Sequence, residues 1–580
     1  MAQYSNQHRP NVGFVWEITD VVLRDTFKKS EIGDVILPFV VLRRIDCVLD
    51  PVNVKVRETF ANLKDKIAEN KLDPVLRKAA GHNFYNISKH TLYSLLDDAK
   101  NISINFTNYM NGFNDEVRKI FENFQFDKVV ARLNRNNLLF KMIQEICKRD
   151  FSLEAVDNHD MGYVFEELIR IANDQSNEQA GEHFTPRDVI RLMSAVLFDP
   201  DRDELRQSNI IRTIYDPACG TGGMVNVGKR FIHEDICGDL TVKPTILTYG
   251  QELNEQSYAI AKSEALVSGE NAENIALGNS FTDDHFKSKV FNYIMANPPY
   301  GVTWKKDQEY IIRESLNPEG RFTAGTPRSS DGQLLFVQHM LSKMSTDGSR
   351  VAVVTNGSPL FSGGAGSGES NIRKWIIEND WLECIIALPK DLFYNTGIYT
   401  YLWIFSNKKG SERKGKVQLI NAVDFCKTAS KSLGNKRNDI VEGNVEYILN
   451  LYRNFKDGEF SKIIPNRDFG KYELTIEQPM RDEQDHIVYK AKKKQGDPSK
   501  RDTEFVSLDC NVKEYFTTEI LPHIDPESWI DIAKTRTSYE INFTRYFYKY
   551  QQPEPSEVIA ERILKSEDSL ESKIRKLFKA

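Results

Sequence analysis

The stretch Asp216-Pro217-Ala218-Cys219-Gly220-Thr221-Gly222-Gly223-Met224 directly follows the apolar run 210–215. This order predicts a strand, a tight turn of small residues and then a helix, which is the arrangement of nucleotide-binding crevices in α/β folds. Glycines permit positive φ angles and a close approach of the backbone, and the helix N-terminus presents unpaired N–H groups to an anion. A tight turn without a ligand is the alternative that this stretch leaves open when it is taken alone.

Two other nucleotide sites are excluded by the spacing of the glycines. The third glycine of the dinucleotide pattern G-x-G-x-x-G is missing after Gly222. Gly228-Lys229 imitates a phosphate-binding loop, but Arg230 stands where a magnesium-binding Ser or Thr is needed, and the pair falls inside the predicted helix. An acidic residue ahead of the glycines, without a phosphate-binding lysine, suits S-adenosylmethionine, whose only anionic group is a carboxylate. A second glycine-rich run, 363–368, is interpreted as a loop that could close over DNA or cofactor.

Short apolar runs recur on both sides of the first stretch and predict a mostly parallel sheet. Helical stretches at 257–267 and 334–344 alternate with these runs, which is typical of βαβ units. The runs lie at residues 210–215, 245–249, 274–277, 291–296, 350–355, 384–388 and 401–405. The last two leave no room for a long helix between them, so we expect an antiparallel edge pair there.

Polar side chains follow the second and third predicted strands. Glu252 stands where a carboxylate can bind both hydroxyls of a ribose. Asn279 and Ser280 follow the third strand and are placed to meet an adenine edge. Taken alone, Glu252 is also compatible with an ordinary surface loop.

Asn297-Pro298-Pro299-Tyr300 ends the fourth predicted strand. Two prolines fix the backbone and cannot continue a strand ladder, so they can aim a main-chain carbonyl. An exocyclic amine such as adenine N6 is a poor nucleophile because its lone pair is delocalised. If the Asn297 side-chain oxygen and the Pro298 carbonyl accept its two N–H bonds, the lone pair points at a sulfonium methyl without a strong base. Tyr300 offers a flat face to a base flipped out of the helix. A strand-terminating turn is the structural alternative.

Length and composition predict two or three domains in a chain of 580 residues, because single cores stop growing near about 250–300 residues. We expect an all-helical domain over 1–170, with helices at 14–27, 34–49, 139–147 and 161–171, and the sheet domain over 171–430. A polar, partly helical extension over 431–580 ends in a charged amphipathic helix at 556–577, and we expect this extension to contact another subunit.

Charge and cysteine usage limit the classes of function. Lys and Arg number 77 against 83 Asp and Glu, a net charge of −6, which argues against gripping nucleic acid through bulk positive charge. Seven scattered cysteines without a C-x-x-C pair favour a reducing cytosol and predict no metal site. The N-terminus does not resemble a signal peptide, and apolar runs long enough to span a membrane are lacking, so we expect a cytoplasmic protein without membrane contact.

The stretches 216–222 and 297–300 together resemble an N6-adenine methyltransferase, and the rest resembles the modification subunit of a type I restriction–modification system. Residues 181–187 (Gly-Glu-His-Phe-Thr-Pro-Arg) are similar to the family's cofactor motif ahead of the sheet, although Glu182 stands where the family often has Gln. Here Thr185 is expected to N-cap a helix with Pro186 at its first position. Residues 35–44 are similar to the family's N-terminal helical domain, and 502–504 and 539–548 to its C-terminal region.

The resemblance implies a role for each matching residue in methyl transfer to N6 of a flipped adenine in DNA. Asn297, Pro298, Pro299 and Tyr300 would hold the target adenine, and Phe393 or Tyr394 would stack on its other face or belong to the core. The cofactor S-adenosyl-L-methionine would be bound by Glu182, His183, Phe184, Thr185, Pro186, Arg187, Asp216, Ala218, Gly220, Thr221, Gly222, Gly223, Glu252 and Asn279. The implied partners are double-stranded DNA, a DNA-specificity subunit, a restriction or motor subunit and a second copy of the chain, in a prokaryotic cell.

Three alternatives remain from the sequence. A stand-alone DNA methyltransferase would carry its own recognition domain after residue 430. A protein glutamine methyltransferase would meet the same delocalised amide nitrogen, but the helical front and the C-terminal likeness disfavour it. A catalytically idle scaffold is disfavoured because the motif residues are present. A partner that reads DNA would reconcile the net charge of −6 with a DNA substrate, because phosphate contacts can lie on that partner.

Overall fold

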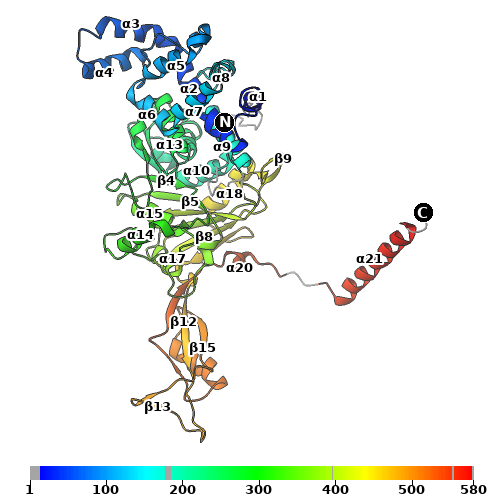
Figure 1. Cartoon of the computed structure of the whole chain (residues 1–580). Helices are drawn as coiled ribbons and strands as arrows, with labels where there is room; N and C mark the ends of the chain where they lie inside the picture. Colours follow the sequence, from blue (N-terminus) through cyan, green and yellow to red (C-terminus); the bar gives the residue numbers. More distant parts are fainter. Residues whose placement is uncertain (1–12, 177–184, 395, 551–553, 578–580) are drawn as a thin grey trace. The chain divides into compact units, whose positions relative to one another are not determined.

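The computed structural model describes residues 13–176, 185–394, 396–550 and 554–577. These residues form two units that meet in sequence between Ile541 and Asn542, and each unit is described by itself. The larger unit holds a helical region, a nine-stranded sheet with its helices, and a small antiparallel sheet (Figure 1). The smaller unit holds two helices, α20 (Phe543–Phe547) and α21 (Ser556–Leu577).

The N-terminal region of the larger unit is helical, as the sequence predicts. Its helices are α1 (Phe14–Ile18), α2 (Ile32–Leu49), α3 (Asn53–Leu63), α4 (Glu69–Ala80), α5 (Ile102–Asn111), α6 (Asp115–Asn123), α7 (Phe126–Arg135), α8 (Leu139–Cys147) and α9 (Asn158–Ser176). The central helix is α2, in which nearly every residue is buried. Such a helix, apolar on all sides, belongs in the middle of a bundle.

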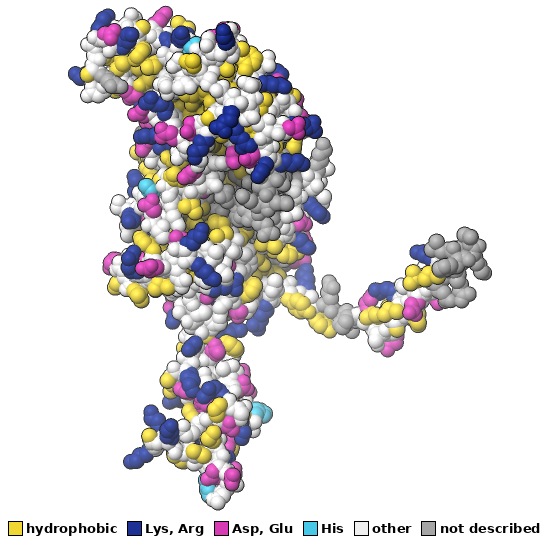
Figure 2. All heavy atoms as spheres, in the orientation of Figure 1, with side chains coloured by type: hydrophobic (Ala, Val, Ile, Leu, Met, Phe, Trp, Pro, Cys, Tyr) yellow, Lys and Arg dark blue, Asp and Glu magenta, His cyan; other side chains and the backbone are white. Residues whose placement is uncertain are grey.

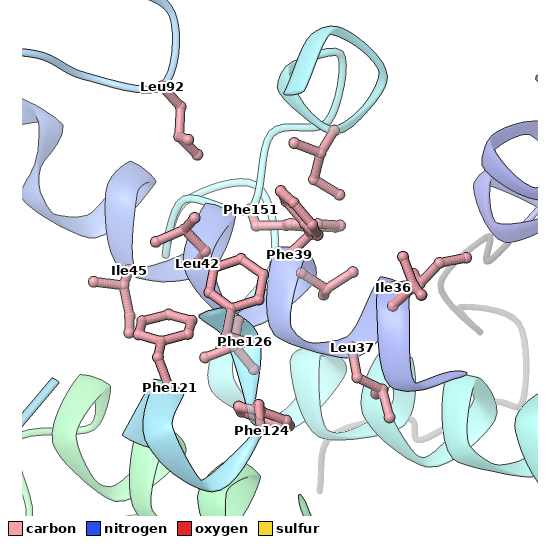
Figure 3. Packing of buried hydrophobic residues seen from close by; sticks show 14 of the residues in the cluster. Ile36, Leu37, Phe39, Leu42, Ile45, Leu92, Phe121, Phe124, Phe126 and Phe151 are labelled. Carbon is pink, nitrogen blue, oxygen red and sulfur yellow. The ribbon is translucent and has the colours of Figure 1, made fainter. Parts of the chain in front are cut away.

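Aromatic rings fill the space around α2 (Figure 3). Phe39 of α2 meets the edge of Phe126 with ring centroids 4.9 Å apart, and Phe126 lies 5.2 Å from Phe121. The edge-to-face contact between Phe39 and Phe126 adds to the free energy gained by burying the rings. This cluster makes the helical region a rigid support for α9, which packs on α2.

Buried charges on α2 fasten the segment that leads into α9. Arg43 pairs with Asp46 at 2.8 Å, and both side chains are buried. Arg44 donates hydrogen bonds to the carbonyls of Phe151 and Val156, both at 2.6 Å. These bonds satisfy part of the buried guanidinium and fix the chain just before α9 begins.

The nine-stranded sheet has the order β11-β8-β6-β7-β5-β4-β1-β2-β3. Its first five strands in sequence, β1 to β5, run parallel to one another. The strands are β1 (Ile211–Asp216), β2 (Thr245–Glu252), β3 (Ile275–Leu277), β4 (Tyr293–Ala296), β5 (Arg350–Asn356), β6 (Leu382–Ala387), β7 (Thr400–Ser406), β8 (Lys416–Asn421) and β11 (Ser461–Pro465). Each of the seven runs predicted from the sequence forms a strand in this sheet.

The antiparallel pairing of the sixth and seventh runs is confirmed, but the position at the edge is wrong. β7 lies between β5 and β6 and is antiparallel to both. The sheet continues past this pair, because β8 is parallel to β6, and β11, antiparallel to β8, forms the outer edge. The sheet therefore extends beyond residue 430, where the sequence predicts the end of this domain.

Helices cover the sheet and join it to the helical region. On one face, α10 (Arg187–Phe198), α12 (Gly223–Phe231) and α18 (Glu442–Asn454) enclose an apolar core with β1, β4 and β5. α13 (Glu255–Val267) packs on α2, α6 and α9, so its apolar residues belong to the core of the helical region. The remaining helices of this part are α11 (Arg202–Leu205), α14 (Gln308–Ser315), α15 (Gln333–Ser342), α16 (Ser358–Phe361) and α17 (Gly368–Glu378).

After β8 the larger unit contains strands that the sequence analysis did not predict. β12 (Gly470–Glu477) pairs with β15 (Asp502–Ser507), β16 (Trp529–Ile530) and β17 (Arg536–Tyr539), all antiparallel (Figure 1). Two hairpins, β9 (Lys427–Leu433) with β10 (Lys436–Asp439) and β13 (Tyr489–Lys490) with β14 (Lys493–Lys494), and the short helix α19 (Val512–Tyr515) complete this part. The extension is partly helical, as expected, because α18 and α19 lie in it, but it also contains these unpredicted strands.

The terminal helix begins and ends where the sequence predicts, at residues 556 and 577. Over the face drawn in Figure 2, Lys and Arg side chains are interspersed with Asp and Glu. Among the helices of the described residues, none is both long and apolar enough to cross a membrane.

Candidate active site

Four strands of the parallel part of the sheet end beside one another, and each is followed by a predicted site residue. β1 ends at Asp216 and β2 at Glu252, while Asn279 and Asn297 follow β3 and β4. Because parallel strands place their carboxyl ends at the same edge of a sheet, these side chains from distant parts of the sequence converge.

The glycine-rich turn after β1 is held by side chains as well as by its own backbone. Gly220 and Gly222 have φ angles of +54° and +82°, which favour glycine, and Gly222 is the N-cap of α12. Oδ1 of Asp216 accepts a hydrogen bond from the backbone N–H of Ala218 at 2.9 Å. Glu252 accepts hydrogen bonds from the N–H of Gly220 at 2.7 Å and of Asn254 at 2.8 Å. The carboxylates therefore fix the turn before any ligand arrives.

Burial changes the protonation of Asp216. It is 2% exposed, and burial raises the pKa of its carboxyl to about 8, while the Ala218 N–H opposes this rise. Near neutral pH the group is largely protonated, because its charged form is poorly solvated there.

Asn279 and Ser280 are already engaged in hydrogen bonds. Oδ1 of Asn279 accepts the N–H of Phe281 at 2.9 Å, and its amide donates to Asp307 at 3.1 Å. The Ser280 hydroxyl donates to the carbonyl of Pro217 at 2.5 Å. These contacts join the β3 end to the glycine-rich turn and to the segment after β4.

The Asn297–Tyr300 segment is closed by a hydrogen bond between its own side chains. The Tyr300 hydroxyl donates to Oδ1 of Asn297. Burial raises the pKa of Tyr300, so this hydroxyl keeps its proton and remains a donor. The ring of Tyr300 meets that of Phe393 edge-on, with centroids 6.4 Å apart. Phe393 is 1% exposed, whereas Tyr394 is half-buried and its carbonyl accepts the N–H of Asn435.

One cavity of about 650 Å³ connects the glycine-rich turn with Asn297. Ten of the predicted site residues line it: Thr185, Asp216, Ala218, Gly220, Thr221, Gly223, Glu252, Asn279, Asn297 and Pro299. Its volume lies in the range of small-molecule sites. The other predicted residues of the described part, Pro186, Arg187, Gly222, Pro298, Tyr300 and Phe393, are not part of this lining, and Glu182, His183 and Phe184 lie outside the described residues.

The expected N-cap at Thr185 is wrong. α10 begins at Arg187, and its N-cap is Pro186, whose carbonyl accepts the N–H groups of Val189 and Ile190. Pro186 has an extended backbone, with φ −57° and ψ 141°, so the proline stands before the helix and not in its first turn. Thr185 nevertheless reaches the cavity wall.

Sequence analysis missed several lining residues. Trp304 and Phe336 form an apolar wall with Phe281, which lies 4.5 Å from Phe336 between ring centroids. Glu166 enters from α9 of the helical region. A carboxylate inside the apolar helix 161–171 is the signal that could have indicated it, because a buried acid needs a partner.

This arrangement suits a ligand with a cationic part and a flat part. Besides the largely protonated Asp216, the described lining includes three acidic side chains, Glu166, Glu252 and Asp307, and one lysine, Lys306. Among the described residues, no group of three or more His, Cys, Asp or Glu side chains is placed to hold a metal ion. The cavity thus has the charge for a cation and the aromatic surface for a planar ring.

Two families of protein domains match the chain. The sequence model of the N-6 DNA methylase family matches residues 156–486, which contain the cavity residues. The HsdM N-terminal domain matches residues 12–146, which form most of the helical region.

Relatives and solved structures agree with these matches. The methylase subunit of the type I restriction enzyme MjaIX of Methanocaldococcus jannaschii is 25% identical over 485 residues, 79% of each chain. The HindI methylase subunit of Haemophilus influenzae is 30% identical over 265 residues, 45% of this chain and 54% of that one. A type I restriction-modification methyltransferase subunit from Streptococcus thermophilus has the same fold, with a TM-score of 0.61 at 21% identity over 79% of this chain and 96% of that one.

Proposed function

Because the chain belongs to the N-6 DNA methylase family, we propose that it transfers the methyl group of S-adenosyl-L-methionine to N6 of an adenine in DNA. One observation carries the proposal: a single cavity joins the carboxylate-anchored glycine turn to Asn297. The first part suits the cofactor and the second suits the acceptor base, and a methyl group can pass directly between ligands that share one cavity.

The cofactor half fits S-adenosylmethionine by charge and by hydrogen bonding. The acidic lining favours a ligand that carries a sulfonium and an ammonium. Glu252 is the candidate for the ribose hydroxyls, and Asn279 for the adenine edge. Thr185, Asp216 and the turn 218–223 would surround the rest, and Glu182, His183 and Phe184 are proposed as further cofactor contacts.

The base half fits an exocyclic amine. S-adenosylmethionine supplies an electrophilic methyl group. The protein therefore needs to point the lone pair of the adenine N6 nitrogen at that methyl group and to accept hydrogen bonds from its two N–H groups, and no strong base is needed. Asn297 Oδ1 and the Pro298 carbonyl are proposed to accept the two N–H bonds of N6. Pro298 and Pro299 keep that carbonyl in place because their φ angles are fixed. Tyr300 and Phe393 are proposed to stack on the faces of the flipped base.

We further propose that the chain works as the modification subunit of a type I restriction–modification complex in the prokaryotic cytoplasm. Its partners would be double-stranded DNA, a DNA-specificity subunit, a restriction subunit and a second copy of itself. α21 supports a protein partner, because its described side chains include exposed large apolar ones: Val558, Ile559, Ile563, Leu564, Leu570 and Ile574. The net charge of −6 supports a division of labour in which a partner makes many of the phosphate contacts.

Transfer of a tritiated methyl group from S-adenosylmethionine to DNA tests the function. We expect N6-methyladenine at defined sites when the chain is combined with a specificity subunit, and weak or no transfer by the chain alone. Strong site-specific transfer by the isolated chain would favour a stand-alone enzyme. Transfer to protein glutamine and never to DNA would overturn the proposal.

A further inference from the structure

Glu166 brings a carboxylate from the helical region into the wall of the cavity. It lies on α9, whose neighbouring residues Phe165 and Leu168 belong to the core around α2. Its side chain lines the cavity together with Thr185 and Gly223. The cavity is therefore built by the helical region as well as by the sheet.

The Glu166 carboxylate is fixed in one position. Its Oε1 accepts a hydrogen bond from Nη2 of Arg187 at 2.5 Å, and both side chains are 10% exposed. The Arg187 guanidinium lies over the ring of Tyr163, 5.0 Å from its centroid. Gly223 leaves the necessary space, because a Cβ there would lie 2.9 Å from Oε1 of Glu166. A charged pair held this tightly presents its remaining acceptor in a defined direction.

Arg187 balances this negative charge incompletely. Glu264 of α13 is also buried, and its electrostatic partners are Arg44 and Arg187, so two buried carboxylates share Arg187. Among the described residues, none donates a hydrogen bond to Oε1 of Glu264. Burial raises the pKa of Glu166, which means that its charged form lacks stabilisation. A cationic ligand beside Glu166 would stabilise this charged form.

We propose that Glu166 binds the α-ammonium group of the amino-acid end of S-adenosylmethionine. This inference rests on the proposed function, because it assigns one further contact in the same site. The orientation of the cofactor in the cavity follows from the positions of two carboxylates. Glu252, the candidate for the ribose, lies at the end of β2. Glu166 lies beside Thr185 and Gly223 at the start of α12, where the amino-acid end would then be bound. Binding of the cofactor then ties α9 to the sheet.

The experiment combines one residue change with one ligand change. Binding of S-adenosylhomocysteine, of its analogue without the α-amino group and of 5′-methylthioadenosine, which lacks the amino-acid part, is measured by calorimetry on the full chain. Glu166→Gln keeps the shape of the side chain and removes its charge. Glu167→Gln is the matched control, because Glu167 is the next residue of α9 and pairs with Arg170 at 2.6 Å.

We expect Glu166→Gln to weaken S-adenosylhomocysteine binding by about 10- to 100-fold and to leave both other ligands within about twofold. The analogue without the amino group should bind wild-type protein more weakly by a similar factor, which tests the contact even if the variant folds poorly. Equal weakening of all three ligands would overturn the proposal, since Glu166 would then hold only the shape of the cavity. If the wild-type chain binds none of them, the cofactor assignment fails instead.

Discussion

In the glycine-rich half of the cavity, carboxylates accept hydrogen bonds from backbone N–H groups, whereas in the Asn297–Tyr300 half one side chain accepts from another. Asp216 and Glu252 hold the turn after β1 through Ala218 and Gly220. Oδ1 of Asn297, the proposed acceptor for the adenine amine, accepts a hydrogen bond from the Tyr300 hydroxyl. The first half is thus preformed for its ligand, while the second must exchange an internal hydrogen bond for one to the base.

Removing the Asn297 amide should distinguish the two halves of the cavity most clearly, because it should affect methyl transfer but not cofactor binding. Asn297→Ala is expected to lower methyl transfer by about 100- to 1000-fold, because a positioned acceptor for the reacting group is lost. S-adenosylhomocysteine should bind within about threefold of wild type, since the preformed half is untouched. Single-turnover tritium transfer and calorimetry measure the two effects.

Asn123→Ala is the control for this change, because Asn123 is on α6 and donates to the backbone of Lys119. Loss of cofactor binding in Asn297→Ala would contradict the division of the cavity into a cofactor half and a base half, because Asn297 would then belong to both.

Changing Glu252 should affect the preformed half. Glu252→Gln is expected to weaken S-adenosylhomocysteine binding by about tenfold or more, because the charged acceptor for the turn and for the proposed ribose contact is removed. A 2′-deoxyribose analogue should lose less affinity on mutation than the parent ligand, which calorimetry can measure. Glu255→Gln, on an exposed side chain three residues later, should leave both affinities unchanged. If the deoxy analogue loses the same affinity, Glu252 supports the turn but does not touch the ribose.

The buried Asp216 predicts a pH dependence of stability. Its pKa is about 8 in the folded chain against an ordinary value of 3.8, so the folded state keeps a proton that the unfolded state releases. Stability contributed by this group is therefore present below about pH 4 and is lost as pH rises towards 8. Asp216→Asn should have a higher Tm than wild type. The difference in Tm should grow by several °C from pH 5 to pH 8, because 1 kcal/mol of stability corresponds to about 2–4 °C.

Differential scanning fluorimetry measures this difference, with Asp347→Asn at an exposed position as the control. A constant difference between Asp216→Asn and wild type across this pH range would show that Asp216 is charged in the folded protein.

Tyr300→Phe should have the smallest effect. It tests whether the hydroxyl or the ring of Tyr300 matters in the Asn297–Tyr300 half of the cavity. It removes the hydroxyl that donates to Asn297 and keeps the ring proposed to stack on the base. We expect extrusion of the target base, followed by fluorescence of 2-aminopurine at that position, to become easier by about two- to fivefold. Tyr300→Ala should instead weaken base binding by about tenfold or more, because stacking is lost. If both variants behave alike, the hydroxyl and not the ring matters.

The sequence predicted the seven strands and the four strand-end residues because each is a local signal, an apolar run followed by a polar or glycine-rich turn. It did not predict β12 and β15–β17, whose short runs are interrupted by the polar segment 478–501. Glu166 was missed for a different reason. Its place in the cavity depends on how α9 packs on α2 and α13, and no periodicity within one helix reveals such a contact.

The position of α9 also sets a limit on recombining such chains. A crossover placed near residue 170, the predicted boundary between the helical and the sheet domain, would take Glu166 from one parent and Arg187 with Gly223 from the other. The resulting chimera would combine two halves of a charged pair selected in different proteins. An exchangeable module in a directed-evolution library should instead keep residues 158–231 together, so that α9, α10 and α12 pass on as one piece.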